Sequence, residues 1–378
     1  MNAAPARPRV LMLSKACLVG IYQRKLEEIA RLGVDLLVIV PPSWRDERGE
    51  TRLERAFTQG YRLETAPIMF NGSFHLHWYP GLGRRLRAFA PHIVHIDEEP
   101  YNLATWQALR QARRAGAKAL FFSWQNINRA YPPPFSWGER WTLARADYAI
   151  AGTDSAAQVW RAKGYRGPLS VIPQFGVDAD LFAPPARPRP KRPFTIGYFG
   201  RLVEEKGLTL LLRAAAALPD SSWRLLIVGG GPQRSALETL ARQTGMGERV
   251  CLRDLVPSAE MPALYHALDA LALPSLTRPN WKEQFGRVLI EAMASGVPVV
   301  GSDSGAIPDV IGPAGLIFPE GDAEALTAHL ARLQASPDLR AHLGQRGRAR
   351  ALACFTHQQV AAATVAVYRE MLKTLNIC

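Results

Sequence analysis

Cysteines are scarce in this chain of 378 residues, with only four at Cys17, Cys251, Cys354 and Cys378. Their wide spacing gives no CxxC pair or disulfide framework, which favours a reducing compartment. The apolar run near the N-terminus, Val10 to Leu13, is too short for a signal peptide. The sequence also lacks a run of about 18 apolar residues that would span a membrane. We therefore expect a soluble, cytoplasmic protein.

The two halves have similar numbers of acidic residues, but basic residues are concentrated in the first. Residues up to Arg192 contain 28 Lys and Arg against 16 Asp and Glu, whereas the rest contain 18 against 17. This asymmetry indicates an anionic partner, such as the acidic inner face of a membrane or a phospholipid-linked acceptor. A generally arginine-rich proteome explains it equally well. The basic segment Leu82–Phe89 has the same two explanations, a membrane-surface helix or a solvated helix face. No nucleic-acid-binding motif is present, so no nucleic-acid partner is expected.

Strand and helix patterns alternate along both halves, which predicts an α/β fold. In the first half a strand at Arg9–Leu13, a loop ending at Gly20, a helix at 21–31 and a strand at 34–40 form a Rossmann-like unit. Tyr61–Thr65 is expected to include short antiparallel strands. The length suggests two domains. The basic, proline-rich segment 184–193 then separates an N-terminal domain (1–183) from a second domain (194–355) and a terminal helix (356–378).

The stretch from Trp281 to Gly301 carries the strongest functional signal. A helix should begin near Gly286 and end at Gly296, a left-handed cap that precedes Pro298. With the strand at 268–273 this forms a βαβ unit, whose helix begins at the carboxyl end of a parallel sheet. Open α/β sheets bind ligands there, and a helix N-terminus favours phosphate.

Two glutamates lie in this stretch, Glu283 on the loop and Glu291 eight residues later in the helix. Carboxylates beside phosphates make electrostatic sense where they accept hydrogen bonds from neutral hydroxyl groups. The pattern therefore indicates a ligand with phosphates and vicinal hydroxyls, such as a ribose or a sugar. Two surface glutamates on a solvated helix are the alternative.

The same stretch resembles the retaining GT-B-fold glycosyltransferases of family 4, whose pattern is E-x-F-G-x-x-x-x-E-A-M-A-x-G-x-P-V-V. The matching positions are Glu283, Phe285, Gly286, Glu291, Ala292, Met293, Ala294, Gly296, Pro298, Val299 and Val300. The resemblance implies two Rossmann-like domains that face a central cleft, with the C-terminal helix crossing back to the first domain.

A second match to the family is G-R-L-x-x-x-K-G, which places Arg201 and Lys206 around one loop. A departing nucleoside diphosphate develops negative charge, and fixed cations stabilise that charge in the transition state. Arginine offers a planar fork for phosphate oxygens and lysine a point charge. A surface pair at the start of a helix is the alternative. The resemblance therefore implies Arg201, Lys206 and Glu283 as catalytic residues.

The resemblance also implies further donor-binding residues, with Glu291 on the ribose hydroxyls and Glu283 on the sugar ring. The other implied donor contacts are Phe285, Gly286, Gly230 in a V-G-x-G-P-like turn, Val256 near the nucleobase and Gly20 in the first loop. Gly20 is equally well explained as a turn glycine. The glycines at 229–231 do not form a dinucleotide fingerprint.

Acceptor contacts are expected in the first half. Many family members have a histidine at the position of Gln125, and glutamine cannot act as a base. Gln125 could still bind a sugar hydroxyl. Glu98, within the acidic run Asp97–Glu99, could bind an acceptor hydroxyl, or the run could cap a helix that begins near Asn102.

The resemblance implies transfer of a hexose from a UDP- or GDP-sugar to an acceptor hydroxyl with retention of configuration, in polysaccharide or glycolipid synthesis. No metal or other cofactor is expected, and Asp178-Ala179-Asp180 reads as a turn rather than a metal-binding D-x-D. A lipid-linked saccharide, a polysaccharide and a small molecule all remain open as acceptors. A non-catalytic nucleotide-sugar-binding GT-B protein is the alternative, because the histidine is missing.

Overall fold

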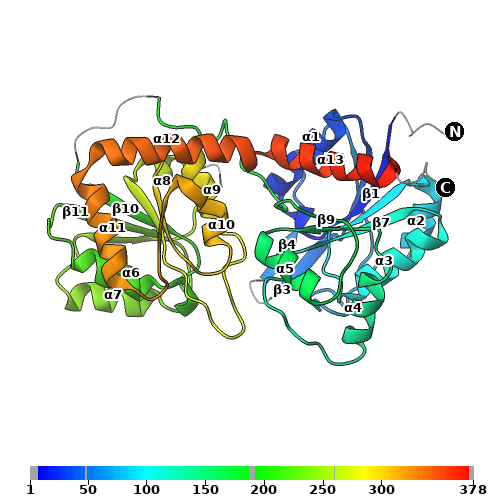
Figure 1. The fold of residues 1–378 in the computed structure, drawn as a ribbon, viewed down its shortest axis with the longest axis horizontal. Coiled ribbons are helices and arrows are strands. Elements are labelled where there is room, and N and C mark those ends of the chain that lie inside the picture. The colour runs from blue at the N-terminus through cyan, green and yellow to red at the C-terminus, as the bar shows by residue number, and fades with distance from the viewer. Residues whose placement is uncertain (1–6, 47–48, 187–191, 259, 374–378) are drawn as a thin grey trace. The chain divides into compact units, whose positions relative to one another are not determined.

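The computed structural model describes residues 7–46, 49–186, 192–258 and 260–373 (Figure 1). Half of the expected linker, residues 187–191, and the end of the expected terminal helix, 374–378, lie outside these ranges. The chain forms two compact units, Met1–Gly176 with His357–Cys378, and Val177–Thr356. None of the helices in the described ranges is long and apolar enough to cross a membrane.

The first unit contains a seven-stranded sheet in the order β5-β2-β1-β6-β7-β8-β9, and every neighbouring pair is parallel. Its strands are β1 (Arg9–Leu13), β2 (Asp35–Val40), β5 (Arg62–Thr65), β6 (Ile93–Ile96), β7 (Lys118–Ser123), β8 (Tyr148–Ala151) and β9 (Leu169–Val171), with a separate hairpin of β3 (Ser43–Asp46) and β4 (Gly49–Arg52). The expectation of antiparallel strands at Tyr61–Thr65 is wrong for the sheet, because β5 extends it as a parallel edge strand beside β2.

Helices cover both faces of this sheet, which is why its central strands are continuous apolar runs. They are α1 (Arg24–Arg31), α2 (Leu82–Phe89), α3 (Leu103–Arg114), α4 (Phe135–Leu143), α5 (Asp154–Ala162) and α13 (His357–Lys373). The last helix, α13, packs beside α1 (Figure 1). Its Tyr368 hydroxyl lies 2.6 Å from His95 Nδ1 beneath the sheet. The C-terminal helix therefore belongs to the core of the first unit.

The second unit contains a six-stranded parallel sheet in the order β12-β11-β10-β13-β14-β15. Its strands are β10 (Phe194–Phe199), β11 (Trp223–Val228), β12 (Val250–Arg253), β13 (Ala270–Leu273), β14 (Val299–Ser302) and β15 (Leu316–Phe318). Its helices are α6 (Leu208–Ala216), α7 (Arg234–Gln243), α8 (Met261–His266), α9 (Arg287–Ala294), α10 (Ile307–Ile311), α11 (Ala323–Ala335) and α12 (Pro337–Cys354). The contacts divide the chain after Gly176 rather than Ala183, since Phe182 lies in the second core.

Strand order positions a site in each unit. In the first sheet the order reverses around β1, which lies between β2 and β6, and in the second it reverses around β10, which lies between β11 and β13. Loops leave the carboxyl ends of such strands in opposite directions, which opens the crevice where α/β sheets bind ligands. The loops after β1 and β6, and those after β10 and β13, are therefore the places to look for chemistry.

Candidate active site

In the second unit, the loops after β10 and β13 bring Lys206 and Glu283 together. The Lys206 ammonium contacts the Glu283 carboxylate at 2.5 Å, and the Ser275 hydroxyl donates to the same oxygen at 2.8 Å. Glu283 is buried, and the ammonium also lies 5.0 Å from the centre of the Trp281 ring. These two predicted catalytic residues, 77 positions apart in the sequence, thus form one buried ion pair.

Two glycines allow the loops to approach this closely. Gly207, directly after Lys206, has a left-handed φ of 68°, and a Cβ there would lie 1.9 Å from the Pro274 carbonyl oxygen. Gly305 has φ of 58°, and its Cβ would lie 2.2 Å from the Glu283 carbonyl oxygen. Any side chain at either position would separate the backbones that hold Lys206 and Glu283.

Glu291 lies in the second turn of α9, which begins after Gly286 in the left-handed conformation and ends before Gly296 at φ of 70°, as predicted. The Tyr265 hydroxyl donates to its carboxylate at 2.7 Å, and Arg287 binds the other oxygen at 2.8 Å. Burial raises the pKa of Glu291, while Arg287 and the Tyr265 hydrogen bond oppose that rise. Arg287 lies four residues before Glu291 on the predicted helix, a spacing that could have marked it as a partner, whereas nothing in the sequence pattern marks Tyr265.

Arg201 follows β10 and is exposed, with its guanidinium 3.7 Å from Glu205. Its loop is fixed by backbone contacts, because the Leu202 N–H donates to the Gly230 carbonyl oxygen at 2.9 Å. A Cβ on Gly229 would lie 1.8 Å from the Gly200 carbonyl oxygen, so the glycine turn packs directly on this loop. Gly230 itself has no atom within 4 Å of an added Cβ. Arg201 and Gly230 therefore share one edge of the sheet.

The other predicted donor contacts in the second unit, Phe285, Gly286 and Val256, lie in different surroundings. Phe285 packs edge-on against Phe355 at 5.9 Å, and a Cβ on Gly286 would crowd the Leu273 side chain at 2.8 Å. Both residues therefore have structural roles beside Glu283. Val256 is half-buried in the loop after β12, next to the exposed Leu255. Their donor contacts stay predictions.

In the first unit, the loops after β1 and β6 bring Lys15 to Glu98. The two side chains form a direct ion pair in which the Glu98 carboxylate is buried, and His77 Nε2 lies 3.6 Å from its other oxygen. Burial alone would raise the pKa of Glu98, but Lys15 and His77 outweigh it and hold that pKa at about 2. Lys15 and His77 were not singled out from the sequence.

The alternative that the acidic run caps α3 is wrong. Asn102 is the N-cap of α3, and the cap has no side-chain hydrogen bond. Asp97 accepts from the Ser14 hydroxyl at 2.5 Å, and Glu99 accepts from the Ser123 hydroxyl at 2.5 Å and from the Trp124 N–H at 2.8 Å. The acidic side chains thus connect loops at the carboxyl edge of the sheet. Burial raises the pKa of Glu99 to about 7, against the lowering effect of its hydrogen bonds.

Gln125 is buried at the same edge, after β7. Its amide nitrogen donates to the Ile127 carbonyl oxygen at 3.0 Å, whereas its buried amide oxygen has no hydrogen-bond partner among the described residues. Gly20 donates its N–H to Glu54 at 2.7 Å, and a Cβ there would lie 2.8 Å from Ala56. Gly20 begins the short 3-10 helix Gly20–Gln23, so close packing against Ala56 and Glu54 favours glycine there. The role of Gln125 toward a sugar hydroxyl stays a prediction.

No group of three or more His, Cys, Asp or Glu that could hold a metal ion occurs in the described part of the chain. The D-x-D sequence forms a turn, because Asp178 accepts hydrogen bonds from the N–H groups of Asp180 and Leu181 at 3.1 Å each.

Comparison with known proteins identifies the family of this chain. Residues 182–350 match the family described as "Glycosyl transferases group 1", and residues 23–205 match "Glycosyltransferase Family 4". A GDP-mannose-dependent alpha-(1-6)-phosphatidylinositol monomannoside mannosyltransferase of Mycolicibacterium smegmatis is 30% identical over 340 residues, covering 82% of this chain and 84% of that protein. The chain belongs to glycosyltransferase family 4.

Solved glycosyltransferase structures show the same architecture over nearly the whole chain. A sucrose-phosphate synthase from Thermosynechococcus elongatus matches with a TM-score of 0.72 at 23% identity, covering 97% of this chain and all of that one. The Anabaena protein HepE in complex with UDP matches with a TM-score of 0.69 at 19% identity, covering 96% and 100%. The fold of this glycosyltransferase is therefore GT-B, as the motifs predicted. Family membership also makes a nucleotide sugar its donor.

Proposed function

We propose that this glycosyltransferase moves a hexose from a GDP- or UDP-sugar to an acceptor hydroxyl with retention at the anomeric carbon. The observation that carries the proposal is the buried Lys206–Glu283 pair next to the exposed Arg201. Two cations at the carboxyl edge of one sheet can stabilise the charge of a leaving diphosphate. Glu283 and Glu291 supply acceptors for the hydroxyls of the sugar and the ribose.

GDP-mannose is the donor to test first. The mycobacterial relative that aligns over most of both chains is named for it. The HepE neighbour contains UDP, so a uridine nucleotide is the matched alternative. The proposed pathway is glycolipid or polysaccharide synthesis, because the relative acts on a phosphatidylinositol mannoside and the first half of this chain is strongly basic.

The proposed reaction needs no metal or other cofactor. In a front-face reaction a donor phosphate oxygen takes the acceptor proton, so no protein base is required at Gln125. Lys206 and Arg201 take the place that a divalent cation has in metal-dependent sites. Transfer should therefore be unchanged in excess EDTA, and loss of activity that Mg²⁺ restores would contradict this part of the proposal.

The decisive experiment is calorimetric titration of GDP and UDP, which needs no acceptor. We expect selective binding of one nucleotide, weakened about tenfold in Glu291→Gln because a carboxylate bound to hydroxyls becomes an amide. Glu248→Gln is the matched control, since Glu248 is exposed in the same unit and has no ion pair within the described ranges. Binding of neither nucleotide would overturn the donor assignment. Binding without any sugar transfer to cell-envelope extracts would favour the non-catalytic alternative.

A further inference from the structure

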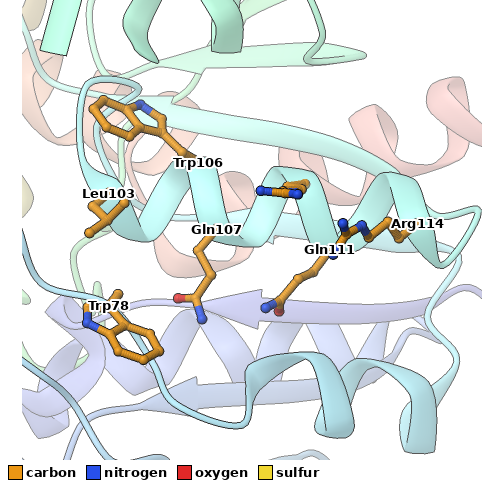
Figure 2. A pocket seen from close by; sticks show the side chains of 7 residues that line it. Trp78, Leu103, Trp106, Gln107, Gln111 and Arg114 are labelled. Atoms are coloured by element: carbon orange, nitrogen blue, oxygen red, sulfur yellow. The ribbon is translucent and has the colours of Figure 1, made fainter. Parts of the chain in front are cut away.

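A face of the first unit along α3 carries two adjoining cavities that the proposed reaction does not use. One of about 530 Å³ runs along the helix, and one of about 470 Å³ lies on its α4 side. Trp106 and Arg110 line both. We call the larger one the α3 groove, defined by Trp78, Trp106, Gln107, Arg110, Gln111 and Arg114 (Figure 2).

Trp106 is held rigidly in this groove. Its indole N–H donates to the Pro100 carbonyl oxygen at 2.9 Å. On the other side it packs on α4 so closely that a Cβ at Gly138 would lie 2.0 Å from the ring. The ring is therefore oriented before a ligand arrives, so little entropy is lost when a flat apolar surface packs on it. The C–H face of a sugar ring is such a surface.

Two arginines of the groove have no partner within the described ranges. Arg110 and Arg114 are exposed and four residues apart, which places them on the same side of α3. The helix dipole favours Arg114 in the last turn but does not account for Arg110. Two like charges at this spacing repel each other, and an anion between them would turn the repulsion into attraction. Neither α2 nor α3 contains an acidic residue that could do so.

The two glutamines of the groove, Gln107 and Gln111, differ in the hydrogen bonds that their amide groups form. Gln107 uses both amide atoms on the Tyr79 backbone, at 2.9 and 2.7 Å, so it forms a fixed wall. Gln111 packs against Gly83, and its buried amide oxygen has no hydrogen-bond partner among the described residues. Figure 2 shows both side chains projecting from the side of α3 that faces Trp78. Both glutamines therefore belong to the polar wall of the groove beside the two arginines.

The groove begins at the edge of the sheet where the acceptor is expected. The Thr105 hydroxyl donates to the Glu99 carbonyl oxygen at 2.7 Å, and the Leu103 N–H donates to the His75 carbonyl oxygen at 2.9 Å. From there α3 runs 12 residues, or about 18 Å, away from the edge. A ligand in the groove can therefore be elongated, with one end near Glu98 and Glu99.

We propose that the α3 groove binds the non-reacting part of the acceptor, a saccharide chain that carries carboxylate or phosphate groups. That this chain is an acceptor rests on the proposed function; the binding itself does not. A preoriented indole and paired arginines inside a concavity suit a discrete chain better than a lipid surface, which is contacted by projecting side chains.

The test uses the full chain and a short oligogalacturonate as the anionic saccharide probe, followed by quenching of tryptophan fluorescence. A malto-oligosaccharide of equal length is the neutral comparison, and phosphatidylglycerol vesicles represent an anionic lipid surface. Arg110→Gln and Arg114→Gln each remove one groove charge. Arg346→Gln removes an equal charge from an exposed position on α12 of the second unit.

We expect the oligogalacturonate to bind at least tenfold more tightly than the neutral chain, and each groove variant to weaken it about tenfold, with Arg346→Gln within twofold. Equal losses in all three variants would mean diffuse attraction to a basic protein and overturn the proposal. So would arginine-dependent binding of the vesicles without binding of the oligosaccharide. GDP and UDP titration of the same variants separates the two claims, because a failed donor site leaves groove binding intact.

Discussion

Both units place a pair of glutamates at the carboxyl edge of a parallel sheet, but the two pairs are bound differently. In the second unit each carboxylate has a cation and a hydroxyl, Lys206 and Ser275 for Glu283, and Arg287 and Tyr265 for Glu291. In the first unit Lys15 pairs with Glu98, whereas Glu99 accepts from a hydroxyl and a backbone N–H.

The difference shows that the partners, rather than the sheet edge, set the protonation of each carboxylate. Glu98 and Glu99 are adjacent, yet the pKa of one is held at about 2 and that of the other is raised to about 7. Neighbouring carboxyls whose pKa values are driven apart can take different roles in one site. The first unit thus holds an anion beside a group whose pKa lies near neutrality, and the second pairs each carboxylate with a cation.

The largest effect is expected from Lys206→Ala, which removes a cation from the proposed diphosphate site. We expect kcat to fall about 10² to 10³-fold, the usual cost of losing one preorganised electrostatic group in a transition state. Glu283→Gln and Arg201→Ala should each reduce transfer by a comparable factor. The measurement is the initial rate of sugar transfer from the donor selected by calorimetry.

Lys373→Ala is the control for this change, because Lys373 is exposed at the end of α13. Arg201→Ala and Lys373→Ala should leave the thermal unfolding midpoint close to that of the unsubstituted chain. Lys206→Ala and Glu283→Gln break a buried ion pair and should lower it, so their rates are measured well below their unfolding midpoints. Near-normal turnover in Lys206→Ala or Glu283→Gln would remove the catalytic assignment from the second unit.

The next largest effect is on stability, from Glu98→Gln in the first unit. Removing one partner of a buried ion pair leaves the Lys15 ammonium without its counter-charge, at a cost of about 3 kcal/mol in the free energy of unfolding. Glu50→Gln, at an exposed ion pair, should leave the free energy of unfolding nearly unchanged. Urea unfolding followed by tryptophan fluorescence measures both, and equal small losses would show that the Glu98 pair is solvated.

The same comparison shows where sequence reasoning succeeds. The pattern located β1 and α2 at the bounds that the structure has, because buried strands and short amphipathic helices leave local signals. The glycines around α9 were assigned correctly, since a left-handed cap is a local requirement. The motif also predicted that Lys206 and Glu283 belong to one site, through the family resemblance rather than through spacing.

Partners contributed by distant segments were not predictable. His77 reaches Glu98 from the loop before α2, and Tyr265 reaches Glu291 from α8, and neither lies at a motif spacing. The parallel pairing of β5 was missed because a polar four-residue edge strand reads the same in either orientation. The capping interpretation of Asp97–Glu99 failed because tertiary partners outcompeted a local hydrogen bond.

A smaller effect is expected from pH, and it separates Glu98 from Glu99. The folded-state pKa of Glu99 is about 7, above the 4.5 of an unperturbed glutamate, so the folded chain holds its proton longer. Stability from this group is therefore lost as pH rises from about 4.5 to 7, on the order of 1 to 2 kcal/mol after allowing for its partial exposure. Glu98 behaves oppositely, since its folded pKa of about 2 means that stability is lost as pH falls below 4.5.

Urea unfolding between pH 3 and 8 measures both expected changes in the free energy of unfolding, the loss above pH 4.5 and the loss below it. Glu99→Gln should reduce the loss of unfolding free energy between pH 5 and 7 and leave the loss below pH 4.5 unchanged. Glu98→Gln should reduce the loss below pH 4.5. If Glu99→Gln leaves the whole pH dependence of the unfolding free energy unchanged, the Glu99 carboxyl group has an ordinary pKa. The contrast between Glu98 and Glu99 then disappears.

The smallest effect is expected from Gln125→His, which restores the side chain that many family members have. A positioned general base contributes about 10² to 10⁴-fold to a rate. If a donor phosphate oxygen takes the acceptor proton, the imidazole adds only one hydrogen bond, and kcat should change less than about fivefold. A gain of 100-fold with a new pH limb near 6.5 would instead show that the first unit supplies a base. The cations of the second unit would then account for only part of the rate enhancement.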